Sequence, residues 1–274
     1  MRALPVANAR MYSATPSVKA DWKELLGWVL KRAGLRWEVI DYDAPAPLSV
    51  LWARDDLGLA MMCGLPFARR AEIPGLKPTL IAAPVPSLAR YAGKPVYFTD
   101  IVVRADSQHQ TLEDTFDGVI GYTLVDSMSG GVALRCHLEG FRNPQRPRLY
   151  RKTTGGFVNA RNVIEALVAG AIDAGPLDSY YHDLLKRNDP GFAAQVRLVA
   201  STAAMPIPPL VATAALAEAE LSRLQAALLA VSSSPELATV LERLQLRGFA
   251  LVEPESYDVL ADMAGSITAS FENI

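Results

Sequence analysis

The order of apolar and polar positions predicts short buried strands that alternate with amphipathic helices. Residues 21–33, for example, carry an apolar face at helical spacing, and Gly34 follows as a residue that commonly ends a helix. Elements of this length in this order predict an α/β fold with largely parallel sheets. The predicted strands cover residues 2–9, 36–42, 57–63, 76–85, 95–104, 119–125, 171–177 and 195–200, and the predicted helices cover 21–33, 48–53, 132–139, 160–169, 212–231, 235–244 and 254–264, with one more helix beginning at 178.

Residues 119–140 contain a strand, a hydroxyl- and glycine-rich turn, and a helix. Ser127 and Ser129 offer hydroxyl donors, and Gly130 and Gly131 let a ligand approach backbone N–H groups. The N-terminus of the following helix adds partial positive charge, so the stretch is typical of an anion-binding site. The alternative is that Ser127 or Ser129 only caps the helix.

Two further polar segments follow predicted strands or turns. Residues 153–159 form a second glycine-bearing turn before a helix, and Asp178 stands at the end of the strand predicted at 171–177. Asp178 is equally well explained as a helix N-cap. Because ligands bind beyond the carboxyl ends of strands in open α/β sheets, the convergence of these segments favours a binding role.

Composition and charge exclude several classes of protein. The 274 residues suggest one or two domains, and half of them are hydrophobic and a fifth charged, which is typical of a compact globular protein. A net charge of −2 argues against nucleic-acid binding. No apolar run approaches the roughly 20 residues that a membrane-spanning helix needs, so no membrane insertion is expected. The basic segment 142–148 is interpreted as a solvated loop.

The residues that most often carry metal or nucleophilic chemistry show no such pattern. Cys63 and Cys136 can pair but do not imply a disulfide framework. His109, His137 and His182 lack metal-ligand spacing and are expected on the surface or as satisfied polar residues. No Ser-His-Asp constellation is visible, so no catalytic residue, metal or cofactor is predicted.

The N-terminus does not match a secretory signal peptide. Residues 3–8 are too short and too interrupted for its apolar region. The expectation is therefore a cytoplasmic chain as written, or a chain from which a leader has been removed.

Several motifs in order carry a resemblance to a known family. YFTDIVVRADS at 97–107, TLED at 111–114, DSMSGG at 126–131 and the stretch from the glycines at 155–156 to 181 resemble the phosphate, phosphite and phosphonate substrate-binding proteins of ABC transporters. These are type 2 periplasmic binding proteins. The segments 11–12 and 63–66 resemble the binding loops of that family's first lobe.

The resemblance implies two α/β lobes, each with a mainly parallel sheet flanked by helices, joined by two crossover strands. Lobe one would cover residues 1–99 and 205–274, and lobe two residues 100–204. The crossings are expected near 99–102 and 200–206, with a small anionic ligand clamped between the lobes.

The same resemblance implies a set of ligand-binding residues. The turn would hold the anion by hydroxyl and backbone N–H groups, and Asp178 would accept a hydrogen bond from a protonated ligand oxygen. Asn159 stands where the family often has a histidine, and Met128 stands where a small hydroxyl residue is usual. The predicted ligand-binding residues are Tyr12, Gly64, Leu65, Tyr97, Ser127, Met128, Ser129, Gly130, Asn159 and Asp178.

Three functions are consistent with this resemblance. The first is a periplasmic solute-binding protein that delivers an oxyanion to an ABC transporter permease. The second is an enzyme on the same fold, such as those of cofactor biosynthesis, and the third is a ligand-sensing regulatory module. A neighbouring permease gene would favour the first, and turnover of the bound compound would favour the second.

Overall fold

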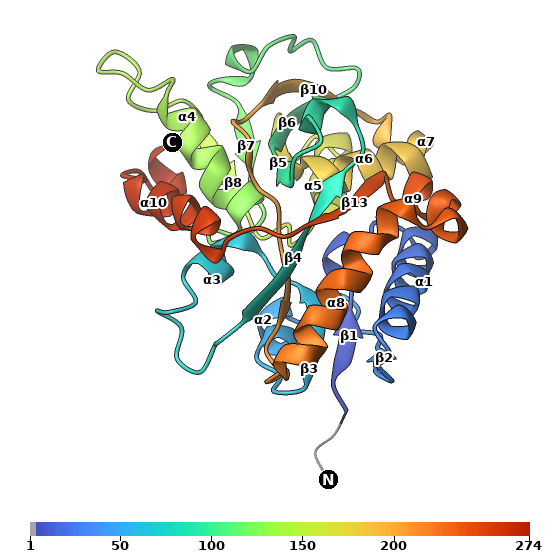
Figure 1. Cartoon of the computed structure of the whole chain (residues 1–274). Helices are drawn as coiled ribbons and strands as arrows, with labels where there is room; N and C mark the ends of the chain where they lie inside the picture. Colours follow the sequence, from blue (N-terminus) through green and yellow to red (C-terminus); the bar gives the residue numbers. More distant parts are fainter. Residues whose placement is uncertain (1–3) are drawn as a thin grey trace. The chain divides into compact units, whose positions relative to one another are not determined.

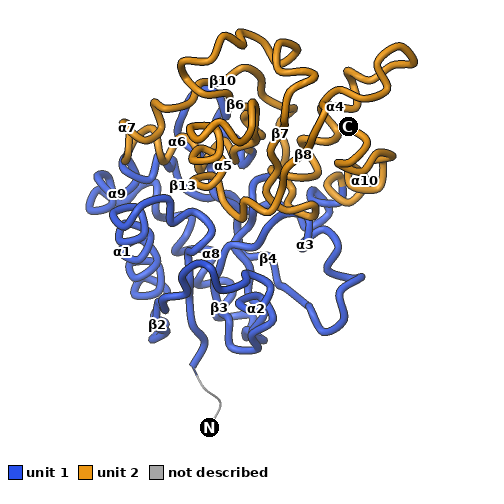
Figure 2. The backbone as a smooth tube through the Cα atoms, turned by 180° about the vertical axis from the view of Figure 1, so that it is seen from behind, with its two compact units in different colours: residues 1–96, 206–258 blue, residues 97–205, 259–274 orange. Residues whose placement is uncertain are grey.

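The chain folds into two compact units. A computed structural model describes residues 4–274. Unit 1 contains the chain up to Val96 together with Pro206–Asp258, and unit 2 contains Tyr97–Met205 together with Val259–Ile274 (Figure 2). The chain therefore changes unit three times, at 96/97, 205/206 and 258/259. The first two changes lie near the predicted crossings.

Unit 1 is built on a six-stranded mixed sheet in the order β13-β4-β12-β3-β1-β2. β1 pairs in parallel with β2 and β3, whereas β12 and β13 pair antiparallel with their neighbours (Figure 1). The strand predicted at 2–9 begins outside the described residues, and its described part is β1. The six strands are β1 (Val6–Asn8), β2 (Glu38–Val39), β3 (Leu57–Met61), β4 (Thr79–Pro86), β12 (Leu210–Ala212) and β13 (Leu246–Ala250).

The first helix of unit 1, α1 (Pro16–Arg32), begins five residues before its predicted start. Thr15 caps it by accepting a hydrogen bond from the Val18 N–H, and Pro16 occupies the first turn, where its missing N–H costs nothing. The buried Asp21 forms a bidentate ion pair with Arg243 of α9, whose Nε and Nη2 donate to the carboxylate oxygens at 2.6 to 3.0 Å. The other helical segments of unit 1 are η1 (Arg10–Tyr12), α2 (Leu48–Trp52), α3 (Gly64–Ala68), η2 (Ala89–Tyr91), α8 (Glu218–Ala230), η5 (Val231–Ser233), η6 (Pro235–Leu237), α9 (Ala238–Arg243) and η7 (Pro254–Tyr257).

Unit 2 contains a three-stranded antiparallel sheet and a separate parallel pair. The sheet has the order β10-β6-β9, and β7 pairs in parallel with β8. The single strand predicted at 95–104 is broken at Phe98 into β5 and β6. The strands are β5 (Val96–Tyr97), which pairs with β11 (Met205–Pro206), β6 (Thr99–Arg104), β7 (Val119–Gly121), β8 (Lys152–Thr154), β9 (Gly175–Asp178) and β10 (Val196–Ser201).

The helices of unit 2 pack around these strands and cover a core that includes Ile101, Val103, Ile120 and Leu134. They are η3 (Glu113–Thr115), the π-helical η4 (Met128–Ala133), α4 (Leu134–Glu139), α5 (Ala160–Val168), α6 (Ser179–Asn188), α7 (Pro190–Ala193), α10 (Asp258–Ser266) and η8 (Phe271–Asn273).

The C-terminal segment belongs to unit 2, although the resemblance placed it in the first lobe. The Ile274 carbonyl accepts hydrogen bonds from the N–H groups of Leu149 and Tyr150, at 3.2 and 3.0 Å. The ring of Phe271 stacks on Tyr122 with 3.8 Å between ring centroids. The C-terminus accordingly lies beside α4 (Figure 1).

The two-lobed α/β architecture is confirmed, but the strand directions are more mixed than predicted. Among the described strands, β1 pairs in parallel with β2 and β3, β7 pairs in parallel with β8, and a single parallel bridge joins Ile120 to Ala174, while β3, β4, β6, β9, β10, β12 and β13 also form antiparallel pairs. Four strands were not predicted. β11 and β12 are only two and three residues long, and the helix predicted from 212 starts at Glu218, because Ala212 ends β12. β13 is interrupted by Arg247 and Gly248 and β8 is a three-residue polar segment, so neither of these two shows the apolar pattern of a strand.

Within residues 4–274, no single helix is long and apolar enough to cross a membrane. Two helical segments, Glu218–Ser233 and Pro235–Arg243, reach the required length and apolar composition only when they are counted as one, and they are bent by 73° where they meet. Cys63 and Cys136 are not joined in a disulfide.

We predict that Phe271→Ala destabilises unit 2 by about 3 kcal/mol, because it removes a buried ring and leaves a cavity beside Tyr122. All four tryptophans lie in unit 1, so their fluorescence reports that unit, whereas hydrogen-exchange mass spectrometry follows peptides of both. Exchange should accelerate in the peptides of unit 2. The control Glu272→Ala changes an exposed neighbour and should stay within about 0.5 kcal/mol. Faster exchange confined to unit 1 would contradict this assignment of the C-terminal segment.

Candidate functional site

The turn after β7 leads directly into a helix capped by Ser127. The Ser127 side chain accepts a hydrogen bond from the Gly130 N–H at 3.4 Å, and its carbonyl accepts from the N–H groups of Gly131 and Val132 at 3.0 and 2.9 Å. The helix thus begins at Met128, four residues before its predicted start, with π-helical geometry that recurs at functional sites. The N–H groups of Met128 and Ser129, as the first of the helix, have no intrahelical acceptor.

The two glycines allow this turn to pack closely on the preceding segment. A Cβ on Gly130 would collide with the Thr123 side chain, and one on Gly131 would collide with the carbonyls of Leu124 and Val125. The predicted strand at 119–125 accordingly stops at Gly121, and the two apolar residues at 124–125 are exposed. These two residues belong to a loop whose carbonyls pack against Gly131 in the first turn of the helix.

Asp178 caps α6. Its Oδ1 accepts hydrogen bonds from the N–H groups of Tyr180 and Tyr181, at 2.9 and 3.0 Å. The capping interpretation is therefore confirmed, and the ligand-binding role stays a prediction. The side chain is half-buried and stands at the carboxyl end of β9.

The start of β6 joins the Ser127 turn to the Asp178 cap. The Thr99 hydroxyl donates to the Ser129 carbonyl at 2.8 Å, while the Thr99 backbone lies opposite Asp178 in the β6–β9 register. Ser179 exchanges two hydrogen bonds with the Phe98 backbone, at 2.8 and 3.0 Å. β9 also packs directly against η4. The structure therefore brings together the two segments that the sequence predicted to converge.

The second glycine turn is linked to the first through Thr123. The Thr123 N–H donates to the Gly130 carbonyl at 3.1 Å, and its carbonyl accepts from the Gly156 N–H at 2.8 Å. Asn159 follows this turn and caps α5, accepting from the Asn162 N–H at 3.0 Å. Ser127, Asn159 and Asp178 thus cap three helices in one unit.

The remaining predicted residues have different surroundings. Met128 is fully buried, so only its backbone can face a ligand, and Tyr97 is also buried, at the end of β5 in unit 2. Tyr12 and Gly64 lie in unit 1, after the carboxyl ends of the neighbouring parallel strands β1 and β3. Leu65 follows Gly64 in α3, a short helix where a tight loop was predicted.

Two phenols next to the Asp178 cap are held in their neutral form. Burial raises the pKa of Tyr180 well above its usual value, and the neighbouring Asp178 and Asp183 carboxylates raise it further. Burial also raises the pKa of Tyr181, while Arg161 of α5 partly opposes that rise. Neither tyrosine therefore adds a negative charge beside Asp178 at neutral pH.

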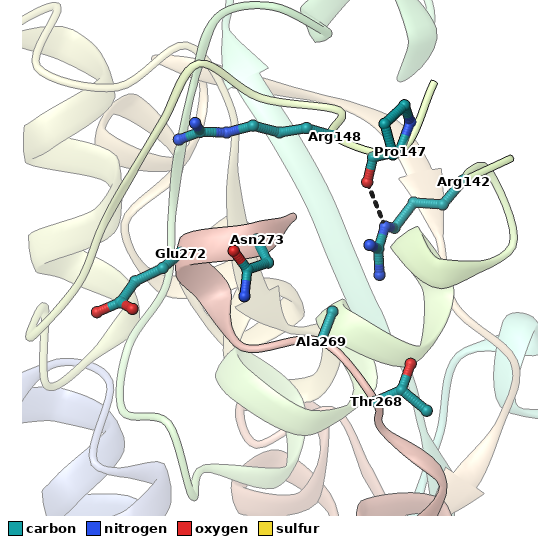
Figure 3. A pocket seen from close by; sticks show the side chains of 7 residues that line it. All are labelled: Arg142, Pro147, Arg148, Thr268, Ala269, Glu272 and Asn273. Atoms are coloured by element: carbon teal, nitrogen blue, oxygen red, sulfur yellow. Dashed lines mark hydrogen bonds between the residues drawn. The ribbon is translucent and has the colours of Figure 1, made fainter. Parts of the chain in front are cut away.

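A separate pocket lies at the other end of α4 (Figure 3). Its volume is about 370 Å³, and none of the predicted ligand residues lines it. Arg142 is held there by the Pro147 carbonyl at 2.7 Å and by Glu139 at 3.0 Å, and Glu272 faces the same space. Two arginines and one glutamate line this pocket. Both arginines are already hydrogen-bonded within the chain, since Arg148 donates to the carbonyls of Tyr150 and Arg151, so we assign the pocket no ligand. Its lining residues are Arg142, Pro147, Arg148, Thr268, Ala269, Glu272 and Asn273.

Thr99 and Thr123 organise the site but were missed by sequence reasoning. Both are buried, at 0% and 8% exposure. Thr99 lies inside the conspicuous β-rich run at 95–104, whose composition gave no reason to single out one hydroxyl. Thr123 was assigned to a strand.

One family model matches most of the chain. Residues 12–257 match the family described as the periplasmic substrate-binding protein of the phosphonate ABC transporter. A search of curated proteins found no match.

Solved structures show the same fold at low sequence identity. A binding protein component of an ABC phosphonate transporter from Pseudomonas aeruginosa is 17% identical, with a TM-score of 0.75 over 95% of this chain and 86% of that one. PhnD1 from Prochlorococcus marinus, in complex with methylphosphonate, is 16% identical, with a TM-score of 0.76 over 96% and 97%. A protein from Xanthomonas citri bound to ATP is 18% identical, with a TM-score of 0.64 over 97% of both chains.

We predict that Gly131→Ala destabilises the protein by about 1–3 kcal/mol, because the added methyl group meets two backbone carbonyls that cannot move aside cheaply. Thermal unfolding measures the loss. Gly191→Ala is the matched control in the same unit, since nothing lies within 4 Å of its Cβ position, and it should be neutral or slightly stabilising. Equal stability of the two variants would mean that the turn is not packed as described.

Proposed function

Since the chain belongs to the family of periplasmic substrate-binding proteins of phosphonate ABC transporters, we propose that it binds a small phosphonate- or phosphate-like oxyanion and delivers it to an ABC transporter permease. The match spans residues 12–257, which includes every predicted ligand residue. The proposed location is the periplasm, as for the family.

The observation that carries this proposal is the geometry of Ser127 at the N-terminus of η4. Because its Oγ accepts from the Gly130 N–H, its own proton is available to donate to an anion. The first N–H groups of the helix and the partial positive charge of its N-terminus favour an anion at the same place. The continuous helical segment runs from Met128 to Glu139, so its dipole is more than one turn long.

Asp178 limits which anions fit. A carboxylate close to a fully ionised oxyanion is unfavourable, because two negative charges would meet in a partly desolvated site. A ligand oxygen that carries a proton removes this repulsion by donating to the carboxylate. The site therefore favours a monoprotonated phosphonate or phosphate, a class that includes the methylphosphonate found in the complex with PhnD1.

We assign supporting roles to the other predicted residues. Asn159 keeps its amide N–H groups for the ligand while its oxygen caps α5. Tyr12, Gly64, Leu65 and Tyr97 are proposed to close over the bound anion, as the family resemblance implies. This closure accords with the hinge motion of two-lobed binding proteins.

We predict that the double substitution Ser127→Ala and Ser129→Ala weakens methylphosphonate binding by about 1–3 kcal/mol, because hydrogen bonds to the charged oxygens are lost. Isothermal titration measures the affinity. Ser107→Ala together with Ser266→Ala changes the same number of hydroxyls in unit 2, away from the turn and from the Asp100 network, and should leave the affinity unchanged. If the turn variant loses thermal stability but keeps its affinity, the serines only cap the helix.

We predict that Asp178→Asn keeps the fold, because asparagine caps a helix about as well as aspartate. The substitution should relax the preference for a protonated ligand, so the wild-type loss of affinity at rising pH becomes shallower in the variant. Titrations of methylphosphonate at about pH 6 and at about pH 8 compare the two proteins. An unchanged affinity with an unchanged pH dependence would leave Asp178 as a cap alone.

A further inference from the structure

The Thr99 hydroxyl makes an unusual contact with the candidate anion turn. Thr99 is fully buried, and its Oγ1 donates to the Ser129 carbonyl at 2.8 Å. Its backbone is held independently, since the N–H donates to Thr202 Oγ1 and the carbonyl accepts from the Thr202 N–H, both at 3.0 Å. The hydroxyl is therefore not needed to keep Thr99 in its strand.

The Ser129 carbonyl and the Gly130 N–H belong to the same planar peptide group. Thr99 holds the carbonyl end of this group, and Ser127 Oγ holds the N–H end at 3.4 Å. A donor on the carbonyl also polarises the N–H opposite, so the hydrogen bond to Ser127 is strengthened. The orientation of the Ser127 hydroxyl thus depends on Thr99 through one peptide group.

The glycine in this peptide makes such an anchor necessary. Gly130 has no side chain to restrict its backbone, and the helix here is π-helical rather than α-helical. Thr123 packs against the Gly130 Cα position from one side, and Thr99 fixes the preceding carbonyl. Without the Thr99 donor, the Ser129 carbonyl would lose its side-chain hydrogen bond, and the orientation of this peptide would depend on the helix and on Ser127 alone.

The same residue also connects the turn to Asp178. Thr99 lies opposite Asp178 in the β6–β9 register, and the next hydrogen bonds along the strand, between Phe98 and Ser179, fix the start of α6. One strand position therefore sets the spacing between the donor side of the site, at Ser127, and its acceptor side, at Asp178.

We propose that Thr99 is a positioning residue for oxyanion binding, which orients the Ser129–Gly130 peptide and through it the Ser127 hydroxyl. This inference rests on the proposed function. It assigns Thr99 no contact with the ligand, because its side chain is fully buried behind the turn.

The test compares Thr99→Val, which keeps the shape and removes the hydroxyl, with Thr99→Ser, which keeps the hydroxyl. Isothermal titration with methylphosphonate and with inorganic phosphate should show an affinity about tenfold lower for Thr99→Val and close to wild type for Thr99→Ser. Hydrogen exchange of the Gly130 amide, measured without ligand, should be faster in Thr99→Val alone.

Thr115→Val is the matched control. Thr115 is also a buried threonine of unit 2 whose hydroxyl donates to a backbone carbonyl, that of Leu112 at 2.6 Å. This variant should lose thermal stability and keep its affinity for both anions. If Thr99→Val does not fold, Thr99→Ala and Thr115→Ala provide the same comparison.

The outcomes separate this inference from the proposed function. If the wild type binds neither anion, the proposed function is wrong and the positioning role falls with it. If the wild type binds but Thr99→Val binds equally well, or loses no more than Thr115→Val, only the role of Thr99 is overturned. Failure of Thr99→Ser to restore the affinity would also overturn it.

Discussion

The buried carboxylate of Asp100 is the constraint on which unit 2 depends. Asp100 is completely inaccessible, and a buried charge is costly unless it is paired and hydrogen-bonded. It receives a hydrogen bond from Ser201 Oγ at 2.8 Å and contacts His182 Nδ1 at 2.9 Å. These partners lie on β10 and α6, so satisfying one side chain of β6 locks three elements together.

This lock determines where the candidate site forms. β6 is the first long strand of unit 2 and β10 ends close to where the chain leaves it, so Asp100 fixes the register of both. With β6 fixed, Thr99, the first residue of this strand, has a defined place. It lies opposite Asp178 and within hydrogen-bond distance of the Ser129 carbonyl in the turn. The site is thus built outward from a buried polar network, and its precision depends on that network being satisfied.

Sequence patterns located the candidate site but not its internal geometry. The hydroxyls and glycines at 126–131 stand out because few other residues tolerate such a turn, so a strand-turn-helix unit was predictable. The start of the helix at Met128 was not predictable from the sequence. Ser129, Gly130 and Gly131 have low helix propensity, and contacts with residues outside the turn hold them in place. The hydrogen bond that fixes Ser129 comes from Thr99, 30 residues earlier, and pattern analysis does not detect such pairs.

Other differences have equally local causes. His182 was expected on the surface or as a satisfied polar residue, and it is buried because Asp100 needs a partner. Within the described residues its Nε2 has no hydrogen-bond partner. The resemblance placed the C-terminal segment in lobe one, whereas residues 259–274 pack with unit 2, and nothing in their composition indicates that Phe271 stacks on Tyr122.

The capping of helices by the three predicted polar residues of unit 2 leaves room for the proposed ligand-binding roles. Ser127, Asn159 and Asp178 each accept hydrogen bonds from the start of a helix. A serine hydroxyl and an asparagine amide that accept a cap bond keep N–H or O–H donors for an anion, whereas a carboxylate keeps only acceptors. The first two therefore suit the charged oxygens of a ligand, and Asp178 suits an oxygen that carries a proton. Because the same residues support the helix ends, a ligand held by these groups would also restrain the three helices, and its binding would stabilise unit 2.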